Sequence, residues 1–289
     1  MSDDVRLHTV WDVVAGVRIR GRVNDRALAR EEGQPHAVFV HGLGMATDYL
    51  EPTMRALGNT MAVSALDLPG FGGSRPSASA DPSTSLGMTA HVIPSERSES
   101  RDLHSRALSL AELAGALVSW VRVRGIVAPI LVGQSHGSQV VVEAVTRAPE
   151  LASAIVLNAP TMLAEHRSIG GQLWRVMRDS PREPLSLVPH VVRDYWNAGP
   201  VRILATLKDA LRDRIEDKLP GVRVPVSIVT GARDPVSPPA WGERLARLAG
   251  ARLTVVPGAA HAVPFSHPEA LAAEIVAMVR LVEANRASR

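Results

Sequence analysis

The stretch that decides the fold runs from residue 129 to residue 147 and reads PILVGQSHGSQVVVEAVTR. Its first residues form a short apolar run that is typical of a buried strand, and its last residues have the spacing of a helix. Between them stands the turn GQSHG, in which glycines flank Ser135 on both sides. A strand, a tight turn and a helix in this order predict one unit of an α/β protein with a parallel sheet.

Similar apolar runs recur along the chain and extend this pattern to a whole sheet. Short runs rich in β-branched residues occupy 37–40, 61–66, 154–157, 225–229 and 252–256, and helical spacing recurs at 107–123, 239–248 and 269–282. Such an alternation indicates a mostly parallel sheet with helices on both faces. In residues 12–23, apolar and polar residues alternate on either side of Gly16, which predicts an antiparallel hairpin at one edge of the sheet. The predicted fold class is therefore α/β, with a mostly parallel sheet and an antiparallel N-terminal hairpin.

The composition narrows the function classes. The chain has 289 residues, of which 46% are hydrophobic and 21% charged, as in a globular protein. It contains no Cys, which excludes a disulfide framework and a thiolate nucleophile. A formal charge of +3 and an aromatic content of 3% argue against a nucleic-acid partner. Because no apolar stretch approaches the roughly 20 residues of a membrane helix, we expect a cytoplasmic protein without a membrane partner.

Two segments interrupt the alternation and define the predicted domains. Residues 76–106 are rich in serine, proline and charge and poor in large aliphatic residues, which predicts a disordered insertion. Residues 161–219 stand between two strands and end in an amphipathic stripe over 203–219, which predicts a helical cap. The core domain then comprises residues 1–160 and 220–289.

Ser135 is the candidate nucleophile, and two downstream residues complete its chemistry. A serine hydroxyl needs a base that takes its proton and a carboxylate that orients this base. Asp234 follows the predicted strand that ends at Val229, and His261 follows the next predicted strand. Because the carboxyl ends of parallel strands meet at one edge of a sheet, we expect Ser135, Asp234 and His261 to lie together.

A glycine-rich turn supplies the other expected part of the site. The sequence HGLG at 41–44 follows a predicted strand, and its glycines allow backbone N–H groups to turn toward a developing oxyanion. The amides of Leu43 and His136 are the two predicted oxyanion donors. We expect neither a metal nor another cofactor. Candidate substrate-binding residues are Gly42 in this turn and three aromatic residues of the predicted cap, Trp174, Tyr195 and Trp196.

These motifs give the chain a resemblance to the α/β-hydrolase superfamily. The matching segments are VFVHGLG at 38–44, LDLPGFGGS at 66–74, VGQSHGSQ at 132–139, VTGARDPVSP at 229–238 and VPGAAHAVPFSHPE at 256–269. The resemblance implies the α/β-hydrolase fold with a helical cap. It also implies Ser-His-Asp acyl chemistry on an ester, a thioester, an amide or an activated carbon–carbon bond, and the fold alone does not choose among these.

The leading prediction is a serine hydrolase that forms an acyl-enzyme on a carboxylic ester or a related small acyl substrate. A carbon–carbon bond hydrolase of ring-cleavage products is an alternative: Trp241 fits this class, whereas Ala262 stands where such enzymes usually carry a Trp. A cofactor-free haloperoxidase-like enzyme would use a similar turn at 41–44. A catalytically silent ligand-binding homologue is the non-enzyme alternative, which the complete set of site residues disfavours. The sequence leaves the oligomeric state open.

Overall fold

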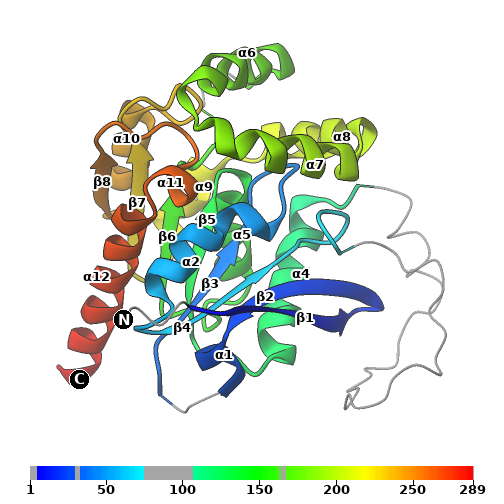
Figure 1. Cartoon of the computed structure of the whole chain (residues 1–289). Helices are drawn as coiled ribbons and strands as arrows, with labels where there is room; N and C mark the ends of the chain where they lie inside the picture. The colour runs from blue at the N-terminus through cyan, green and yellow to red at the C-terminus, as the bar shows by residue number, and fades with distance from the viewer. Residues whose placement is uncertain (1–4, 30–32, 75–106, 162, 164–166, 289) are drawn as a thin grey trace, which may run out of the picture.

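An eight-stranded sheet runs through the centre of the molecule (Figure 1). The computed structural model describes residues 5–29, 33–74, 107–161, 163 and 167–288, so the insertion predicted at 76–106 lies outside the described residues. The strands are β1 (Leu7–Val14), β2 (Val17–Asn24), β3 (His36–Val40), β4 (Ala62–Leu66), β5 (Ile130–Gln134), β6 (Ala154–Asn158), β7 (Val226–Gly231) and β8 (Arg252–Val256). Their order in the sheet is β1-β2-β4-β3-β5-β6-β7-β8.

The strand directions confirm the predicted fold class. β1 pairs antiparallel with β2, and β2 pairs antiparallel with β4. Every pair from β4 across to β8 is parallel. The predicted N-terminal hairpin is therefore present at one edge, with its turn at Ala15 and Gly16, which both have positive φ.

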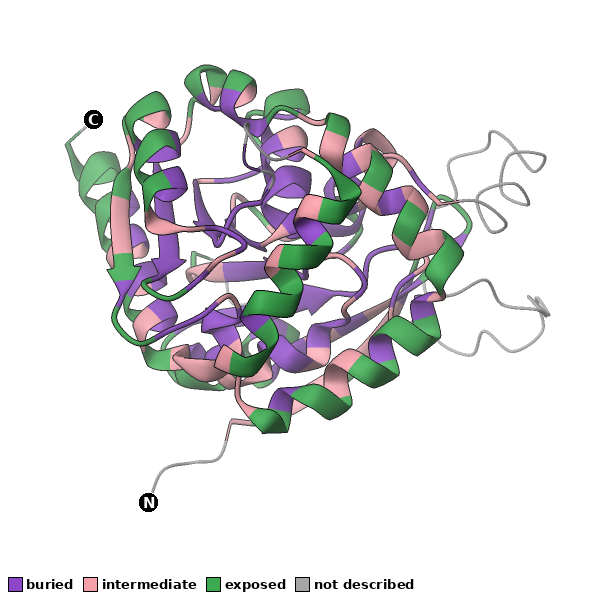
Figure 2. Cartoon of the chain, turned by 90° about the horizontal axis from the view of Figure 1, so that it is seen from above, coloured by how far each residue is buried: buried purple, intermediate pink, exposed green. Residues whose placement is uncertain are grey.

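Helices cover both faces of the sheet. One face carries α4 (Leu110–Val123), α5 (His136–Arg147) and α10 (Pro239–Ala249), and the other carries α2 (Glu51–Leu57), α11 (Val263–Ser266) and α12 (Pro268–Ala287). Two further short elements, α1 (Asp25–Ala29) and the 3-10 turn η1 (Thr47–Leu50), join the first strands. Sequence periodicity did not predict α1, α2 and α11, because elements of four to seven residues make too few turns to show a repeat. Figure 2 shows that the buried residues of the outer helices face the sheet and their exposed residues face away.

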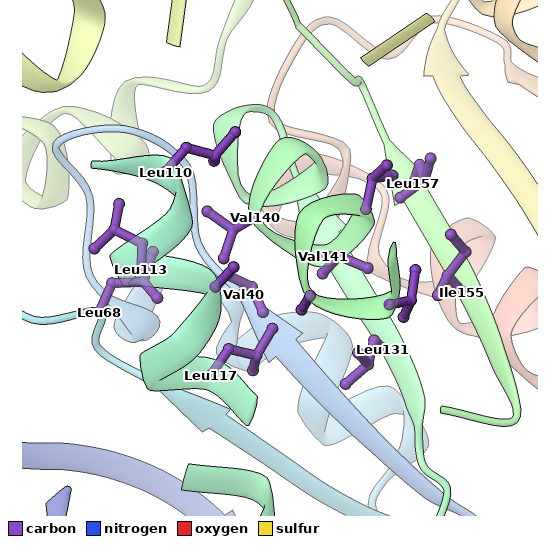
Figure 3. Packing of buried hydrophobic residues seen from close by; sticks show 14 of the residues in the cluster. Val40, Leu68, Leu110, Leu113, Leu117, Leu131, Val140, Val141, Ile155 and Leu157 are labelled. Carbon is purple, nitrogen blue, oxygen red and sulfur yellow. The ribbon is translucent and has the colours of Figure 1, made fainter. Parts of the chain in front are cut away.

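Branched aliphatic side chains fill the space between the sheet and its helices. In Figure 3, side chains from β3, β5 and β6 meet those of α4 and α5. All are buried, and each contributes about 1.5 to 3 kcal/mol to folding by leaving water. A capping box at the start of α4, in which Ser109 and Glu112 satisfy each other's backbone amides, holds this helix in place. The site therefore stands on a rigid, close-packed base.

The segment between β6 and β7 forms a helical layer above the carboxyl ends of the strands (Figure 1). Its elements are α6 (Ile169–Asp179), η4 (Ser180–Arg182), η5 (Leu185–Leu187), α7 (Val188–Ala198), α8 (Pro200–Arg212), α9 (Ile215–Lys218) and η6 (Leu219–Gly221). We refer to α6 through α8 as the upper helices. Whether residues 161–219 form a separate domain stays a prediction. Among the described residues, no helix is both long and apolar enough to cross a membrane.

The structure corrects the expectation that the amphipathic stripe over 203–219 forms a single final helix. The stripe over 203–219 is divided into α8 and α9, and the backbone is extended at Asp213 between them, with ψ 140°. The Asp213 carboxylate accepts a hydrogen bond from Gln139 Nε2 on α5 at 2.9 Å and pairs with Lys218. These tertiary contacts override the helical periodicity. As a result, Ile215 and Leu219 pack into the core of the sheet.

Candidate active site

Ser135 stands on a strained turn between β5 and α5. Its φ of 56° and ψ of −122° place it in the left-handed half of backbone space, which a residue with a side chain seldom adopts. The Ser135 amide donates to the carbonyl of Asn158 at 2.8 Å, which ties the turn to the end of β6. The turn therefore holds the serine hydroxyl at the carboxyl edge of the sheet, at the start of α5.

The two glycines that flank Ser135 are required by close backbone contacts. A methyl group at Gly133 would lie 2.6 Å from the carbonyl oxygen of Gly137 and from Cα of Ser138. A methyl group at Gly137 would overlap the carbonyl of Val40 on β3. Neither backbone can retreat without disturbing the sheet, so this G-x-S-x-G pattern has a steric cause.

Ser135, His261 and Asp234 lie in one hydrogen-bonded row. His261 Nε2 is 3.0 Å from Ser135 Oγ, and His261 Nδ1 is 2.8 Å from Asp234 Oδ2. The other carboxylate oxygen of Asp234 accepts hydrogen bonds from the amides of Val236 at 2.7 Å and Ser237 at 2.9 Å. Asp234 is buried, so these partners fix the orientation of its carboxylate. Three residues from separate loops are thus brought together as the strand order predicts.

The carboxylates around His261 control its charge. Burial would lower the pKa of His261, but the charge and hydrogen bond of Asp234, together with the charges of Asp179 and Glu183, raise this pKa to about 9. The site therefore favours the imidazolium form, which is the form that arises when the imidazole takes a proton from Ser135.

A hydrogen-bonded chain behind the row connects three loops. The Gly42 amide donates to the Tyr49 hydroxyl at 2.9 Å, and this hydroxyl donates to Gln134 Oε1 at 2.7 Å. Gln134 Nε2 in turn donates to the carbonyl of His261 at 3.4 Å. The sequence interpretation missed the roles of Tyr49 and Gln134, although Gln134 lies inside the serine motif. This chain holds the glycine-rich turn, the serine turn and the histidine loop at fixed separations.

The two predicted oxyanion donors are available for a ligand. In the described part of the chain, neither the Leu43 amide nor the His136 amide donates a hydrogen bond to another protein group. His41 lies below this turn, where Nε2 accepts from the Leu68 amide at 2.9 Å and Nδ1 lies 2.8 Å from the Gly42 carbonyl. Because burial lowers the pKa of His41, its imidazole is neutral and carries its proton on Nδ1, which donates to Gly42. Burial also lowers the pKa of His136, to about 4, with a smaller contribution from His41.

Comparison with known proteins places this fold in a family. The model of the alpha/beta hydrolase family matches residues 37–274, which span the sheet from β3 to β8 and the helical layer above it. The chain belongs to the alpha/beta hydrolase family.

Two kinds of individual protein are similar to this alpha/beta hydrolase: a curated relative that matches part of the chain, and solved structures that share its fold. It is 38% identical over 89 residues to a pimeloyl-[acyl-carrier protein] methyl ester esterase of Neisseria meningitidis, a match that covers 30% of this chain and 34% of the relative. The matched region thus spans about a third of the curated relatives. Among solved structures, a thermophilic esterase from Thermogutta terrifontis superposes with a TM-score of 0.70 at 18% identity, over 95% of this chain and 99% of the esterase. E-2-(Acetamidomethylene)succinate hydrolase superposes with a TM-score of 0.68 at 19% identity, over 95% of this chain and all of the other chain. Structural similarity at this identity shows the shared fold alone.

Two carboxyl groups from the helical layer of this alpha/beta hydrolase approach His261 from above. Glu183 Oε1 accepts a hydrogen bond at 2.6 Å from the amide of Ala262, the residue after His261. Asp179, at the end of α6, is 6% exposed and contacts Glu183. Burial, the charge of Glu183 and the charge of Asp234 raise the pKa of Asp179, although His261 opposes this shift. The sequence interpretation missed this pair, because charged residues four apart in a helical segment are typical of a solvated surface.

The aromatic residues predicted to bind substrate lie in different surroundings. A methyl group at Gly44 would lie 2.8 Å from the ring of Tyr195, so this ring covers the glycine-rich turn. Trp174 and Trp196 are 61% and 86% exposed. Substrate contacts of Gly42, Trp174, Tyr195 and Trp196 stay predictions.

A cavity at the opposite edge of the sheet has a different character. It has a volume of about 510 Å³ and lies where strands β3, β5 and β6 begin, between Pro35, Arg124 and Ser153. Sites in parallel α/β sheets form at the carboxyl ends of strands, and the residues around this cavity do not include Ser135, His261 or Asp234. The candidate active site is therefore the row at the carboxyl edge.

Proposed function

We propose that this alpha/beta hydrolase is a serine hydrolase that cleaves a carboxylic ester or a related small acyl substrate through an acyl-enzyme. The observation that carries the proposal is the continuous row from Ser135 Oγ through both nitrogens of His261 to Asp234. A row of this kind lets one imidazole take a proton from the serine and deliver it to the leaving group. A hydroxyl without such a base is a weak nucleophile.

The contacts of Asp234 set the tautomer that this chemistry needs. Two backbone amides bind one carboxylate oxygen, so the other is directed at His261 Nδ1. A proton on Nδ1 leaves a lone pair on Nε2, which is the atom nearest Ser135 Oγ. Asp234 is thus a positioning residue that also stabilises the imidazolium.

The proposed reaction has two halves, acylation of Ser135 and deacylation by water. In the first half, His261 Nε2 takes the Ser135 proton while Oγ bonds to the substrate carbonyl carbon, and the amides of Leu43 and His136 stabilise the oxyanion. The carbon–oxygen bond to the alcohol breaks, and His261 returns the proton to that alcohol. In the second half, water loses a proton to His261 Nε2 and attacks the acyl-enzyme carbonyl carbon; the acyl–Oγ bond then breaks, and His261 returns the proton to Ser135 Oγ as the carboxylic acid leaves.

The relatives support an ester as the substrate. The Neisseria relative is named as a methyl ester esterase, and the Thermogutta structure is named as an esterase. Ala262 beside His261 also favours this proposal over carbon–carbon bond hydrolysis, because the carbon–carbon bond hydrolases that the chain resembles usually carry a Trp at this position. We expect the helical layer to limit the chain length of the acyl group, and turnover of p-nitrophenyl esters of increasing chain length measures this limit.

Covalent labelling of Ser135 tests the proposal. A fluorophosphonate probe should form one adduct on the folded protein, located on Ser135 by peptide mass spectrometry, and p-nitrophenyl esters should be turned over. Ser135→Ala should lose both the adduct and the turnover. Ser138→Ala is the matched control: its hydroxyl donates to the Gly133 carbonyl at 2.9 Å, so its loss should cost about 1 kcal/mol of stability and leave the label in place. Turnover that survives in Ser135→Ala would contradict the assignment.

A further inference from the structure

Among the described residues, Asp179 is the buried acid to which no N–H group or hydroxyl donates a hydrogen bond. The other buried acids each accept at least one hydrogen bond from an N–H or O–H group, and they are Asp12, Asp67, Asp194, Glu216, Asp234 and Glu274. Within the described residues, no N–H group or hydroxyl donates to Asp179, which contacts the Glu183 carboxyl, and its Oδ1 is fully enclosed without a donor. A buried carboxylate that lacks donors lowers the stability of the fold. Asp179 Oδ1 therefore has unused capacity to accept a hydrogen bond from a group outside the described chain.

Glu183 presents a second free oxygen at the same place. Its Oε1 is bound by the Ala262 amide, whereas its Oε2 is enclosed and lacks a donor among the described residues. No Lys or Arg of the described chain pairs with either carboxylate. Three basic residues of the same helical segment bind other groups: Arg175 donates to the Pro235 carbonyl, Arg182 to the Arg178 carbonyl, and Arg193 pairs with Asp48 and Asp194.

The pair is adjacent to the reacting atoms. Glu183 is bonded to the residue next to His261, and the charges of both acids act on the His261 imidazole. His261 Nε2 is in turn 3.0 Å from Ser135 Oγ. A group that binds between the two carboxyls therefore lies beside the carbonyl carbon that Ser135 would attack.

We propose that Asp179 and Glu183 form a subsite for a primary ammonium group of the substrate. This inference rests on the proposed function for its location beside the scissile bond. An ammonium group has one positive charge and three N–H donors, which match the negative charge of the pair and its two free oxygens, Asp179 Oδ1 and Glu183 Oε2. The chemical class is thus an ester of an amino-bearing acid or alcohol.

The contact between the two acids shows what the ligand replaces. Two carboxyl groups in contact share a proton when no cation is present, and the raised pKa of Asp179 fits this state. Binding of an ammonium group separates the carboxyls, occupies their free oxygens and releases the shared proton to solvent. The affinity for the ammonium group should therefore increase as the pH rises through the pKa of Asp179.

Competition by three small molecules tests the subsite in the whole protein. The probes are n-butylammonium, n-butanol and n-butyltrimethylammonium, and the readout is inhibition of p-nitrophenyl butyrate hydrolysis. We expect n-butylammonium to inhibit competitively with a Ki about tenfold to 100-fold lower than that of n-butanol, as for charge-assisted hydrogen bonds. The trimethyl compound carries the charge without N–H donors and should fall between them. Equal Ki values for the three probes would overturn the proposal.

A double variant locates the effect. In Asp179→Asn/Glu183→Gln, the ratio of the Ki values for n-butanol and n-butylammonium should fall to about 1. Asp217→Asn is the matched control, because it removes an exposed acid that pairs with Arg214 in the same helical segment; it should keep the wild-type ratio. A double variant that keeps the ratio would overturn the subsite.

Thermal stability separates this inference from the proposed function. If p-nitrophenyl esters are not hydrolysed and Ser135 is not labelled, the proposed hydrolase fails, but the subsite is still tested by the melting temperature of the wild-type protein. n-Butylammonium at millimolar concentration should raise the melting temperature while n-butanol at the same concentration does not. Labelled Ser135 without an ammonium-specific effect contradicts the subsite alone.

Discussion

The edge of the sheet and the upper helices hold their buried acids in opposite ways. Asp234, at the sheet edge, accepts hydrogen bonds from two backbone amides and faces His261 Nδ1. Asp179, on α6, acts on the same imidazole through its charge, and no described N–H group or hydroxyl donates a hydrogen bond to it. In the proposed mechanism, the acid that the backbone holds orients the base and stabilises its imidazolium form. In the proposed subsite, Asp179 turns its free oxygen to the substrate, so under the two proposals the sheet edge supplies reactivity and the upper helices supply selectivity.

The largest effect is expected at the acid of the sheet edge. Asp234→Asn should lower kcat for p-nitrophenyl butyrate by about 10³- to 10⁴-fold, because the amide does not hold the Nδ1–H tautomer or stabilise the imidazolium. Initial rates at saturating substrate measure this loss. The control is Asp217→Asn, whose exposed carboxylate should change kcat by less than about twofold. A loss below tenfold in Asp234→Asn would remove the distinction between the two acids.

Matched glycine substitutions compare the packing of the two layers. Gly137→Ala should lower the free energy of unfolding by about 1 to 3 kcal/mol, because the new methyl group meets the β3 backbone. Gly170→Ala on α6 meets nothing within 4 Å and should raise the free energy of unfolding by about 0.5 kcal/mol through helix propensity. Denaturant titration measures both values. Equal effects would mean that the layers are packed alike.

The pH dependence of turnover reports the charge that the upper helices place on His261. The imidazole must be neutral to take the Ser135 proton, so kcat/KM should rise with pH and level off only above the His261 pKa of about 9. Asp179→Asn removes a negative charge that favours the imidazolium and should shift this rise to lower pH by about one unit. Asp217→Asn should leave the midpoint in place. A midpoint at pH 6.5 in the pH profile of the wild-type protein would show that Asp179 and Glu183 do not raise the pKa of His261.

The smallest effect is expected at the exposed aromatic residues of the upper helices. Trp196→Ala should change the free energy of unfolding by less than about 0.5 kcal/mol, because its ring is 86% exposed. Trp174→Ala, at 61% exposure, should behave similarly. Steady-state kinetics on the same variants tests the predicted substrate contacts, because the loss of such a contact would raise KM. A loss above about 2 kcal/mol in either variant would show that these rings pack more closely than their exposure indicates.

The sequence predicted the sheet and its carboxyl edge more completely than it predicted the upper helices. The six predicted parallel strands begin within one residue of the observed ones, because each is an apolar run bounded by turn residues. Ser135, Asp234 and His261 could be expected together because each follows such a run, and parallel strands bring these ends to one edge.

The helical layer was less predictable because its contacts are tertiary. Asp213 interrupts the amphipathic stripe by bonding Gln139 on α5, which no local pattern reveals. Asp179 and Glu183 have the spacing of solvated residues, and only the packing of α6 over the histidine loop turns them inward. Tyr49 and Gln134 were missed for a related reason, since a side-chain hydrogen bond between distant loops leaves no periodic signal.

The connection between β6 and β7 has a consequence for protein engineering. It leaves the sheet after Asn158 and returns at Val226 to a strand that pairs directly with β6. Its final turns, around Ile215 and Leu219, lie against the sheet and make the crossover that two parallel neighbours need, while α6 and α7 stand above it. Because the entropic cost of a longer loop grows only slowly with its length, we expect the pairing of β6 with β7 to tolerate upper helices of different length. Grafting them from another member of the family onto this sheet offers a route to new substrate preferences with the strand pairing unchanged.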